Sequence, residues 1–131
     1  MKLITRDTDY ALRALLFIAN HEDRLVSVTE LVNELKIPRP FLRKLLQDLN
    51  KNNILRSYKG FSGGFKLALD PDKIFLIDLM KIFQGEIVLN ECIFKKKECP
   101  NKPTCRLRAK IRVIEKQVLH QLKPITIGSL L

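Results

Sequence analysis

The chain has 131 residues, a formal net charge of +10 at pH 7 and a hydrophobic fraction of 46%. This composition predicts one compact globular domain rather than a disordered chain, and the excess of positive charge indicates a polyanionic partner. The N-terminus lacks a signal-peptide pattern and no run of about 18 apolar residues occurs, so we expect a cytoplasmic protein that does not span a membrane.

The first half of the chain predicts a helix-turn-helix. Residues 7–20 have the spacing of an amphipathic helix with Asp7 or Thr8 as N-cap, and Ser-Val-Thr-Glu at 27–30 matches a capping box that opens a short second helix. Pro40 suits the first position of a third helix, where its missing N–H costs nothing. The expected buried stripe of that helix is Phe41, Leu42, Leu45, Leu46 and Leu49. Its free face carries Arg39, Arg43, Lys44, Gln47 and Lys51.

A β-hairpin is predicted next. Strand-like runs at 54–58 and 65–68 flank residues 59–64, which hold three of the five glycines of the chain. A hairpin that follows a helix-turn-helix is a wing, and we expect Phe61 and Phe65 to be packing residues within it. Residues 36–66 contain eight basic side chains and one acidic side chain, whereas residues 1–35 contain four basic and six acidic ones. Such a basic unit is typical of nucleic-acid binding, with a solvated basic face as the alternative.

The second half predicts two more helices around a cysteine-containing segment. A helix over 75–83 should stop at Gly85, residues 86–104 show no periodicity, and a long helix should run from 105 to 122. The long helix has an apolar seam, which we expect to pack on a second copy or, alternatively, to cover its own core. The seam consists of Leu107, Ile111, Ile114 and Val118.

These elements divide the chain into three expected parts. Residues 1–85 form a winged helix-turn-helix DNA-binding domain, residues 86–104 a cysteine loop, and residues 105–131 a dimerisation helix with a C-terminal tail. The expected fold class is mostly α with a small β-hairpin. No paired carboxylates, nucleophile–base pattern or Walker loop occurs, so we do not expect an enzyme.

Three cysteines, Cys92, Cys99 and Cys105, follow a C-x6-C-x5-C pattern. In a reducing compartment an odd number of cysteines favours metal ligation or redox chemistry over disulfides. Thiolates are the usual ligands of iron–sulfur clusters, whereas structural zinc more often uses C-x2-C pairs and four ligands. The spacing alone leaves a cluster, zinc and unligated thiols open.

Several strings resemble the Rrf2 family of bacterial winged-helix transcription regulators. They are Thr-Asp-Tyr-Ala-Leu-Arg at 8–13, the Phe-Leu and leucine pattern of 41–49, Ser-Tyr-Lys-Gly-Phe-Ser-Gly-Gly-Phe at 57–65, and Ile-Thr-Ile-Gly at 125–128. The likeness covers nearly the whole chain, and the three cysteines are similar to those of the cluster-binding (IscR/NsrR-like) branch. The resemblance implies a homodimeric repressor of transcription that binds double-stranded DNA. It further implies an iron–sulfur cluster, 2Fe–2S by preference, that senses nitric oxide, redox state or iron and cluster supply.

A 2Fe–2S cluster needs a fourth ligand besides the cysteines. In IscR-like members this is a histidine three positions after the last cysteine, where the present chain has Arg108, which does not ligate. In NsrR-like members an aspartate at the start of the first helix of the partner subunit takes this role, and Asp9 matches it. The alternative role of Asp9 is to favour the positive end of its helix, and Asp7 and Glu91 are lesser ligand candidates. The resemblance thus implies the ligand set Cys92, Cys99, Cys105 and Asp9.

The predicted third helix should enter the major groove of DNA with its N-terminal residues at base edges. The candidate contacts are Arg39, Arg43, Lys44 and Gln47, together with Lys59 and Gly60 at the wing tip. The family often has an acidic residue in place of Arg43, so a known operator of the family need not carry over to this chain. It usually has an arginine in place of Lys59, so we expect weaker reading of the minor groove here. The alternative function is a thiol- or zinc-stabilised winged-helix adaptor that binds an acidic protein.

Overall fold

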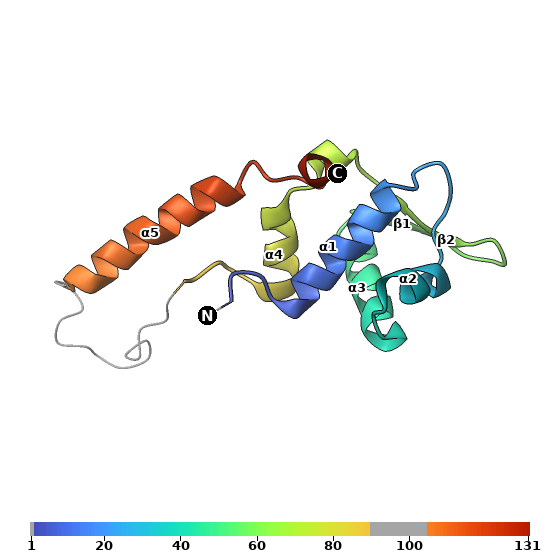
Figure 1. Ribbon diagram of the computed structural model, residues 1–131, viewed down its shortest axis with the longest axis horizontal. Coiled ribbons are helices and arrows are strands. Elements are labelled where there is room, and N and C mark those ends of the chain that lie inside the picture. Colours follow the sequence, from blue (N-terminus) through green and yellow to red (C-terminus); the bar gives the residue numbers. More distant parts are fainter. Residues whose placement is uncertain (1, 90–104) are drawn as a thin grey trace.

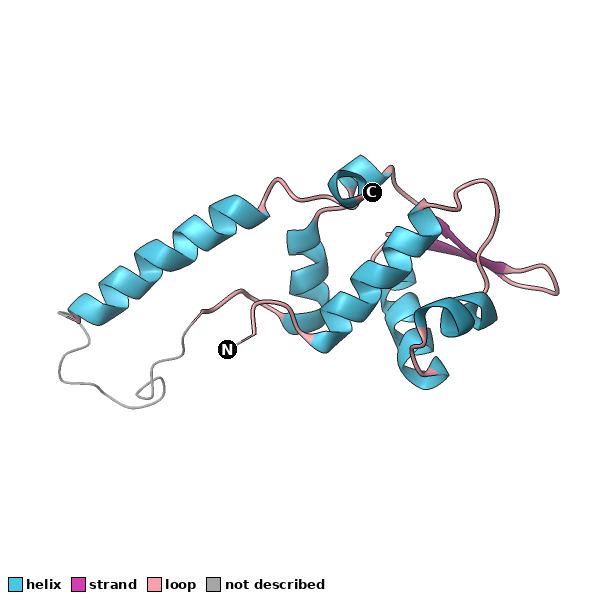
Figure 2. Ribbon diagram, viewed as in Figure 1, coloured by secondary structure: helices cyan, strands magenta, loops and turns pink. Residues whose placement is uncertain are grey.

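The computed structural model describes residues 2–89 and 105–131. In Figure 1 the first three helices and a two-stranded hairpin form a head, one helix lies against it, and a long helix extends away from it. The described helices and strands are α1 (Arg6–Ala19), α2 (Val28–Leu35), α3 (Arg39–Lys51), β1 (Leu55–Tyr58), β2 (Gly64–Leu67), α4 (Leu76–Gln84) and α5 (Arg106–Leu122). The predicted fold class, mostly helical with a small hairpin, is confirmed, as Figure 2 shows.

Helix α1 begins earlier than its sequence pattern indicated. Thr5 is the N-cap, and its hydroxyl accepts a hydrogen bond from the backbone N–H of Thr8 at 3.5 Å, so the prediction of Asp7 or Thr8 as the cap was wrong. Asp7 and Asp9 lie instead in the first turn, where negative charge stabilises a helix. Thr8 is fully buried, which places the start of α1 inside the packed head.

The capping box that was predicted for α2 forms only in part. The Ser27 hydroxyl accepts from the Glu30 backbone N–H at 3.1 Å, as expected, but the Glu30 carboxylate binds the Arg24 guanidinium. Lys36 ends α2 in the left-handed conformation with φ of 57°, and the turn that follows leads into α3, with Pro40 in its first turn. These two helices make the expected helix-turn-helix.

The hairpin is antiparallel, with Leu55 opposite Leu67 and Tyr58 opposite Gly64. Strand β2 is held next to the turn by an isolated bridge in which Val26 and Phe65 exchange two backbone hydrogen bonds, at 3.0 and 2.8 Å. A Cβ at position 64 would lie 2.6 Å from the Val26 carbonyl oxygen, so glycine is required for this close approach. The wing is therefore anchored to the segment that precedes α2.

A single main core joins α1, α2, α3 and the hairpin. A smaller cluster of Leu76, Met80 and Leu122 attaches the C-terminal end of α5 to α4. The tail then returns to the start of α4, where Leu76 N–H donates to Ile125 O and Ile127 N–H donates to Ile74 O, each at 2.9 Å. Helix α5 is thus fixed at its C-terminal end, and its other end lies away from the head (Figure 1). In the described ranges, no helix is at once long enough and apolar enough to cross a membrane.

Candidate nucleic-acid interface

Helix α3 separates its side chains into two faces. Leu42, Leu45, Leu46 and Leu49 are buried in the head, as predicted. The polar side chains predicted for its free face all face solvent: Arg39, Arg43, Lys44, Gln47 and Lys51. Asn50 is exposed as well, and Asp48 is half-buried. The helix therefore presents four cations to solvent beside one half-buried carboxylate.

The positive charge of this face is largely uncompensated. Arg39 donates to the Thr29 hydroxyl at 3.1 Å, which links the start of α3 to the first turn of α2. Arg43 and Lys44 have no carboxylate within 4.0 Å among residues 2–89 and 105–131, where the salt bridges involve other residues. The centre of the α3 face thus carries two cations oriented to an external partner.

Phe41 departs from the prediction that it is buried. It is 47% exposed, and the Arg6 guanidinium lies 5.0 Å from the centre of its ring. This distance is within the range of a cation–π interaction. Phe41 therefore connects the first turn of α1 to the first turn of α3, beside the basic face.

The wing tip brings Lys59 and Gly60 to solvent, as expected for contacts with a partner. Gly60 has φ of +113°, and its carbonyl accepts from Gly63 N–H at 3.0 Å to close a turn. Phe65 packs against the core, as predicted, but the prediction that Phe61 is a packing residue was wrong. Its relative exposure is 109%, because it occupies the apex of the turn, where no neighbouring element reaches it.

An ion pair stiffens the approach to α2. Arg24 forms two hydrogen bonds with the Glu30 carboxylate, one of them at 2.7 Å. The hydrogen bond from Arg24 lowers the pKa of the Glu30 carboxyl, and the same bond raises the pKa of Arg24. Glu30 is therefore ionised at neutral pH and holds the loop before the helix-turn-helix to α2.

A hydrogen-bond hub that no sequence pattern indicated lies at Gln84, the last residue of α4. Its Oε1 accepts from the Thr5 backbone N–H at 3.1 Å and from the Thr8 hydroxyl at 2.8 Å, while its Nε2 donates to Leu3 O at 2.9 Å. These partners lie more than 75 positions away, so only the fold brings them together. The hub fixes the start of α1 against the end of α4, next to the point where the cysteine segment begins.

The candidate cluster ligands fall partly outside the described residues. Cys92, Cys99 and the lesser candidate Glu91 lie there, so the predicted ligand set stays a prediction. Cys105 is the N-cap of α5, half-buried, with its sulfur accepting from Arg108 N–H at 3.4 Å. Within the described ranges, no group of three or more His, Cys, Asp or Glu side chains forms a metal site.

Asp9, the predicted fourth ligand, lies in the first turn of α1. Its side chain is 41% exposed, and Oδ2 accepts from Arg13 Nε at 2.8 Å. Ligation through Oδ2 would compete with this ion pair. Because the carboxylate is accessible from outside the chain, a ligand role toward a second subunit is sterically open.

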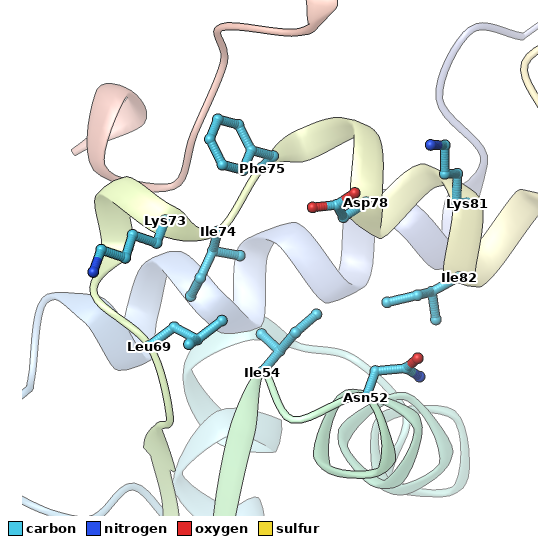
Figure 3. Close-up of a pocket in the computed structure, with 9 residues that line it drawn as sticks. All are labelled: Asn52, Ile54, Leu69, Lys73, Ile74, Phe75, Asp78, Lys81 and Ile82. Carbon is cyan, nitrogen blue, oxygen red and sulfur yellow. The ribbon is translucent and has the colours of Figure 1, made fainter.

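A pocket of about 330 Å³ lies between the base of the hairpin and α4 (Figure 3). Its floor is apolar, with Ile54, Ile74 and Ile82, and its charged groups do not converge. Figure 3 shows the ammonium groups of Lys73 and Lys81 at opposite ends. The pocket therefore lacks the clustered polar groups of a specific ligand site.

The α5 seam is apolar and poorly covered by the rest of the chain. Leu107 is 67% exposed and Ile114 is 47% exposed, whereas Val118, near the anchored end, packs against the small cluster with Leu122. Among the described residues, the N-terminal part of the seam therefore lies open to solvent, and its packing on a second copy stays a prediction.

Comparison with known proteins identifies the family. Residues 4–131 match the Rrf2 family, which is described as iron-dependent transcriptional regulators. An HTH-type transcriptional regulator of Aquifex aeolicus is 36% identical over 124 residues, which cover 93% of this chain and 86% of the relative. The transcriptional regulator NsrR of Halalkalibacterium halodurans is 32% identical over 129 residues, with 91% and 88% covered.

The fold agrees with that of a solved relative. The structure of CymR, the global cysteine regulator of B. subtilis, superposes with a TM-score of 0.78 at 24% identity, covering 99% of this chain and 96% of CymR. The named relatives regulate transcription, a role that is not enzymatic, as the sequence led us to expect. With its winged helix-turn-helix and a family match over residues 4–131, the chain belongs to the Rrf2 family of transcriptional regulators.

Proposed function

We propose that this protein is a homodimeric DNA-binding regulator whose affinity for its operator is controlled by an iron–sulfur cluster. The observation that carries the DNA-binding part is the exposed face of α3, whose central cations Arg43 and Lys44 have no carboxylate partner among the residues that the structure describes. A helix-turn-helix presents such a face to the major groove. The branch to which the three cysteines were assigned, and the family's description as iron-dependent, support the cluster.

In this proposal α3 reads the bases of the operator, and the wing contacts the DNA next to them. Arg43 and Gln47 are exposed one turn apart on α3, so both reach base edges in the same stretch of groove, and arginine pairs well with guanine there. Lys44 and Arg39 lie beside them and supply phosphate contacts. Lys59 and Gly60 at the wing tip contact the neighbouring backbone and minor groove.

The dimer in this proposal forms through α5. The seam residues Leu107, Ile111 and Ile114, of which Leu107 and Ile114 are exposed and Ile111 is half-buried, recur at heptad-like spacing on a helix that projects from the head. Two copies that pair along this seam bury it and bring two heads to one operator. The two α3 helices must then lie about 34–36 Å apart, one turn of DNA, to enter successive major grooves.

The cluster in this proposal is held by Cys92, Cys99 and Cys105, with Asp9 of the second copy as fourth ligand. The donor set fits, because thiolates are the usual ligands of such clusters and Cys105 caps the N-terminus of α5, where the helix dipole and neighbouring arginines favour negative charge. When bound, the cluster supplies a centre that reacts with oxidants and nitric oxide. The residues of this chain hold the ligands in position and transmit a change in ligation to the head.

The transmission of a change in ligation depends on which elements the cysteine segment joins. Residues 86–104 begin two residues after Gln84, which holds the start of α1, and they end next to Cys105, the N-cap of α5. A change in ligation therefore acts on the two elements that set the position of the heads: the α1–α4 junction and the dimer helix. A small change in the distance between the two heads is enough to alter how the two α3 helices enter successive major grooves.

One experiment tests the two parts of this proposal separately. Anaerobically purified protein is assayed for visible absorption, iron and acid-labile sulfide, and it is used to enrich duplexes from a random-sequence DNA library at two salt concentrations. We expect a coloured protein and a selected duplex whose affinity falls steeply with salt. Colourless, iron-free protein from iron-replete cells would contradict the cluster, while zinc in its place would support a structural-metal role. Failure to enrich any duplex, together with retention of an acidic protein, would favour the adaptor function.

A further inference from the structure

The most exposed apolar side chain of the described residues lies at the tip of the wing. Phe61 has a relative exposure of 109%, and it belongs to neither hydrophobic cluster of the head. The hydrogen bond from Gly63 N–H to Gly60 O makes Phe61 the first central residue of the turn, which is its outermost point. The ring thus projects beyond the rest of the hairpin.

The turn that carries Phe61 is tightly built. Gly60 adopts a positive φ of 113°, and a Cβ at position 63 would lie 2.2 Å from the Tyr58 carbonyl oxygen, so glycine is required at both ends of the turn. Phe65, two residues after the turn, is bridged to Val26. The ring is therefore presented on a supported backbone at a defined place, and not on a long free loop.

All charged side chains of the hairpin are basic. No acidic residue occurs between Asp48 and Asp70, and the hairpin itself carries three exposed cations, Arg56, Lys59 and Lys66. A neutral apolar ring inside a cationic surface fits a partner that combines an anionic backbone with an apolar interior. Stacked base pairs between two phosphate backbones have this character, and proteins insert Phe or Leu wedges between base steps through the minor groove.

We propose that Phe61 is an apolar wedge that enters the minor groove next to the α3 site and inserts its ring between two adjacent base pairs. This inference rests on the proposed DNA-binding function. Lys59, two residues earlier, contacts the phosphates. The wedge unstacks one base step and bends the duplex, so it adds a preference for easily deformed steps such as TA or CA. Specificity at the flank of the operator then comes from DNA deformability as well as from charge.

The test uses the intact protein and a duplex that it enriches from a random-sequence library. A 2-aminopurine placed at successive positions of the flank reports unstacking by a rise in fluorescence. We expect the wild-type protein to give such a rise at one step. Phe61→Ala should lose it and bind about tenfold more weakly, because the variant cannot stack a ring on the bases. Phe61→Leu, another wedge-forming side chain, should retain most of the signal.

The matched control is Lys59→Ala, which removes a phosphate contact two residues away. It should reduce the salt dependence of binding by about one counterion and leave the unstacking signal intact, whereas Phe61→Ala should leave the salt dependence unchanged. Neither substitution should alter thermal unfolding, because both side chains are exposed. Comparison of the two variants distinguishes insertion of the Phe61 ring from electrostatic attraction of Lys59 to the phosphates.

Three results would overturn the wedge. The first is equal duplex affinity of Phe61→Ala and wild type, and the second is the absence of any 2-aminopurine response to wild-type protein that binds the duplex. Either result removes the wedge and leaves the DNA-binding function standing. The third is failure of the wild-type protein to enrich any duplex, combined with Phe61-dependent binding to phosphatidylglycerol vesicles. That result removes the proposed function as well and assigns the ring to a lipid surface.

Discussion

Gln84 holds the start of α1 to the end of α4, so replacing it should lower the stability of the folded protein. Gln84→Ala removes the acceptor of the fully buried Thr8 hydroxyl, which keeps only its contact with the Thr5 hydroxyl at 3.1 Å. It also removes the bonds of Gln84 to Thr5 N–H and Leu3 O. A net hydrogen bond contributes about 0.5–1.5 kcal/mol, so we expect the free energy of unfolding to fall by at least about 1 kcal/mol. Urea denaturation measures it, with Gln117→Ala on the exposed surface of α5 as the matched control. An equal effect of the two substitutions would contradict the role of the hub.

Glu30 should make stability depend on pH in the acidic range. Its folded-state pKa is lowered by the hydrogen bond from Arg24, so its contribution is fully present above the ordinary carboxyl pKa of about 4.3 and is lost as the pH falls through the lower folded value. We therefore expect wild type to exceed Glu30→Gln in stability at neutral pH, with the difference shrinking below about pH 4. Chemical denaturation at several pH values measures this. A difference that grows toward acid would contradict the assigned ion pair.

At the scale of elements, α3 is the part of the interface most open to direct test. Arg43 and Lys44 are exposed and make no salt bridge in the described part of the chain, so replacing both with Ala should spare the fold. We expect the double variant to bind its selected duplex at least about tenfold more weakly, since a base-reading arginine alone contributes about 1–3 kcal/mol. Fluorescence anisotropy measures the affinity. Lys116→Ala together with Arg112→Ala, two exposed cations of α5, gives a control with the same loss of charge. If the control pair weakened binding as much, the effect would be one of net charge and not of the α3 face.

The elements themselves were largely predictable from sequence, because local signals specify them. Leucine spacing fixed the buried face of α3, and the cap at Ser27 and the stop at Gly85 were read directly from residue type. The errors concern long-range or terminal contacts. Phe41 has the spacing of a core residue, but it lies at the edge of the stripe beside Arg6. Phe61 is aromatic in a hairpin, yet it occupies the turn and not a strand. No local pattern marks Gln84 as a hub, since its partners lie more than 75 positions earlier in the chain.

At the scale of the whole molecule, the proposed dimer rests on the seam of α5. Ile114→Glu places a carboxylate on that seam, and burying an unpaired charge costs on the order of several kcal/mol, so we expect a folded monomer. Val113→Glu is the matched control: Val113 is similarly exposed but lies about a third of a turn to the side of the seam. Analytical ultracentrifugation distinguishes the two, with the control expected to stay dimeric. Two dimeric variants would place the subunit interface elsewhere.

The most direct test of a cluster-controlled regulator is the affinity of one anaerobic preparation for its selected duplex before and after removal of the cluster. We expect iron and sulfide in a ratio that fits 2Fe–2S, and an affinity that changes by about tenfold or more when the cluster is removed, since allosteric coupling is typically about 1–3 kcal/mol. Cys99→Ala should bind DNA with the affinity of the cluster-free protein and should not change on the same treatment. Identical affinities of the loaded and cluster-free wild type would contradict control by the cluster, even if both forms bound DNA tightly.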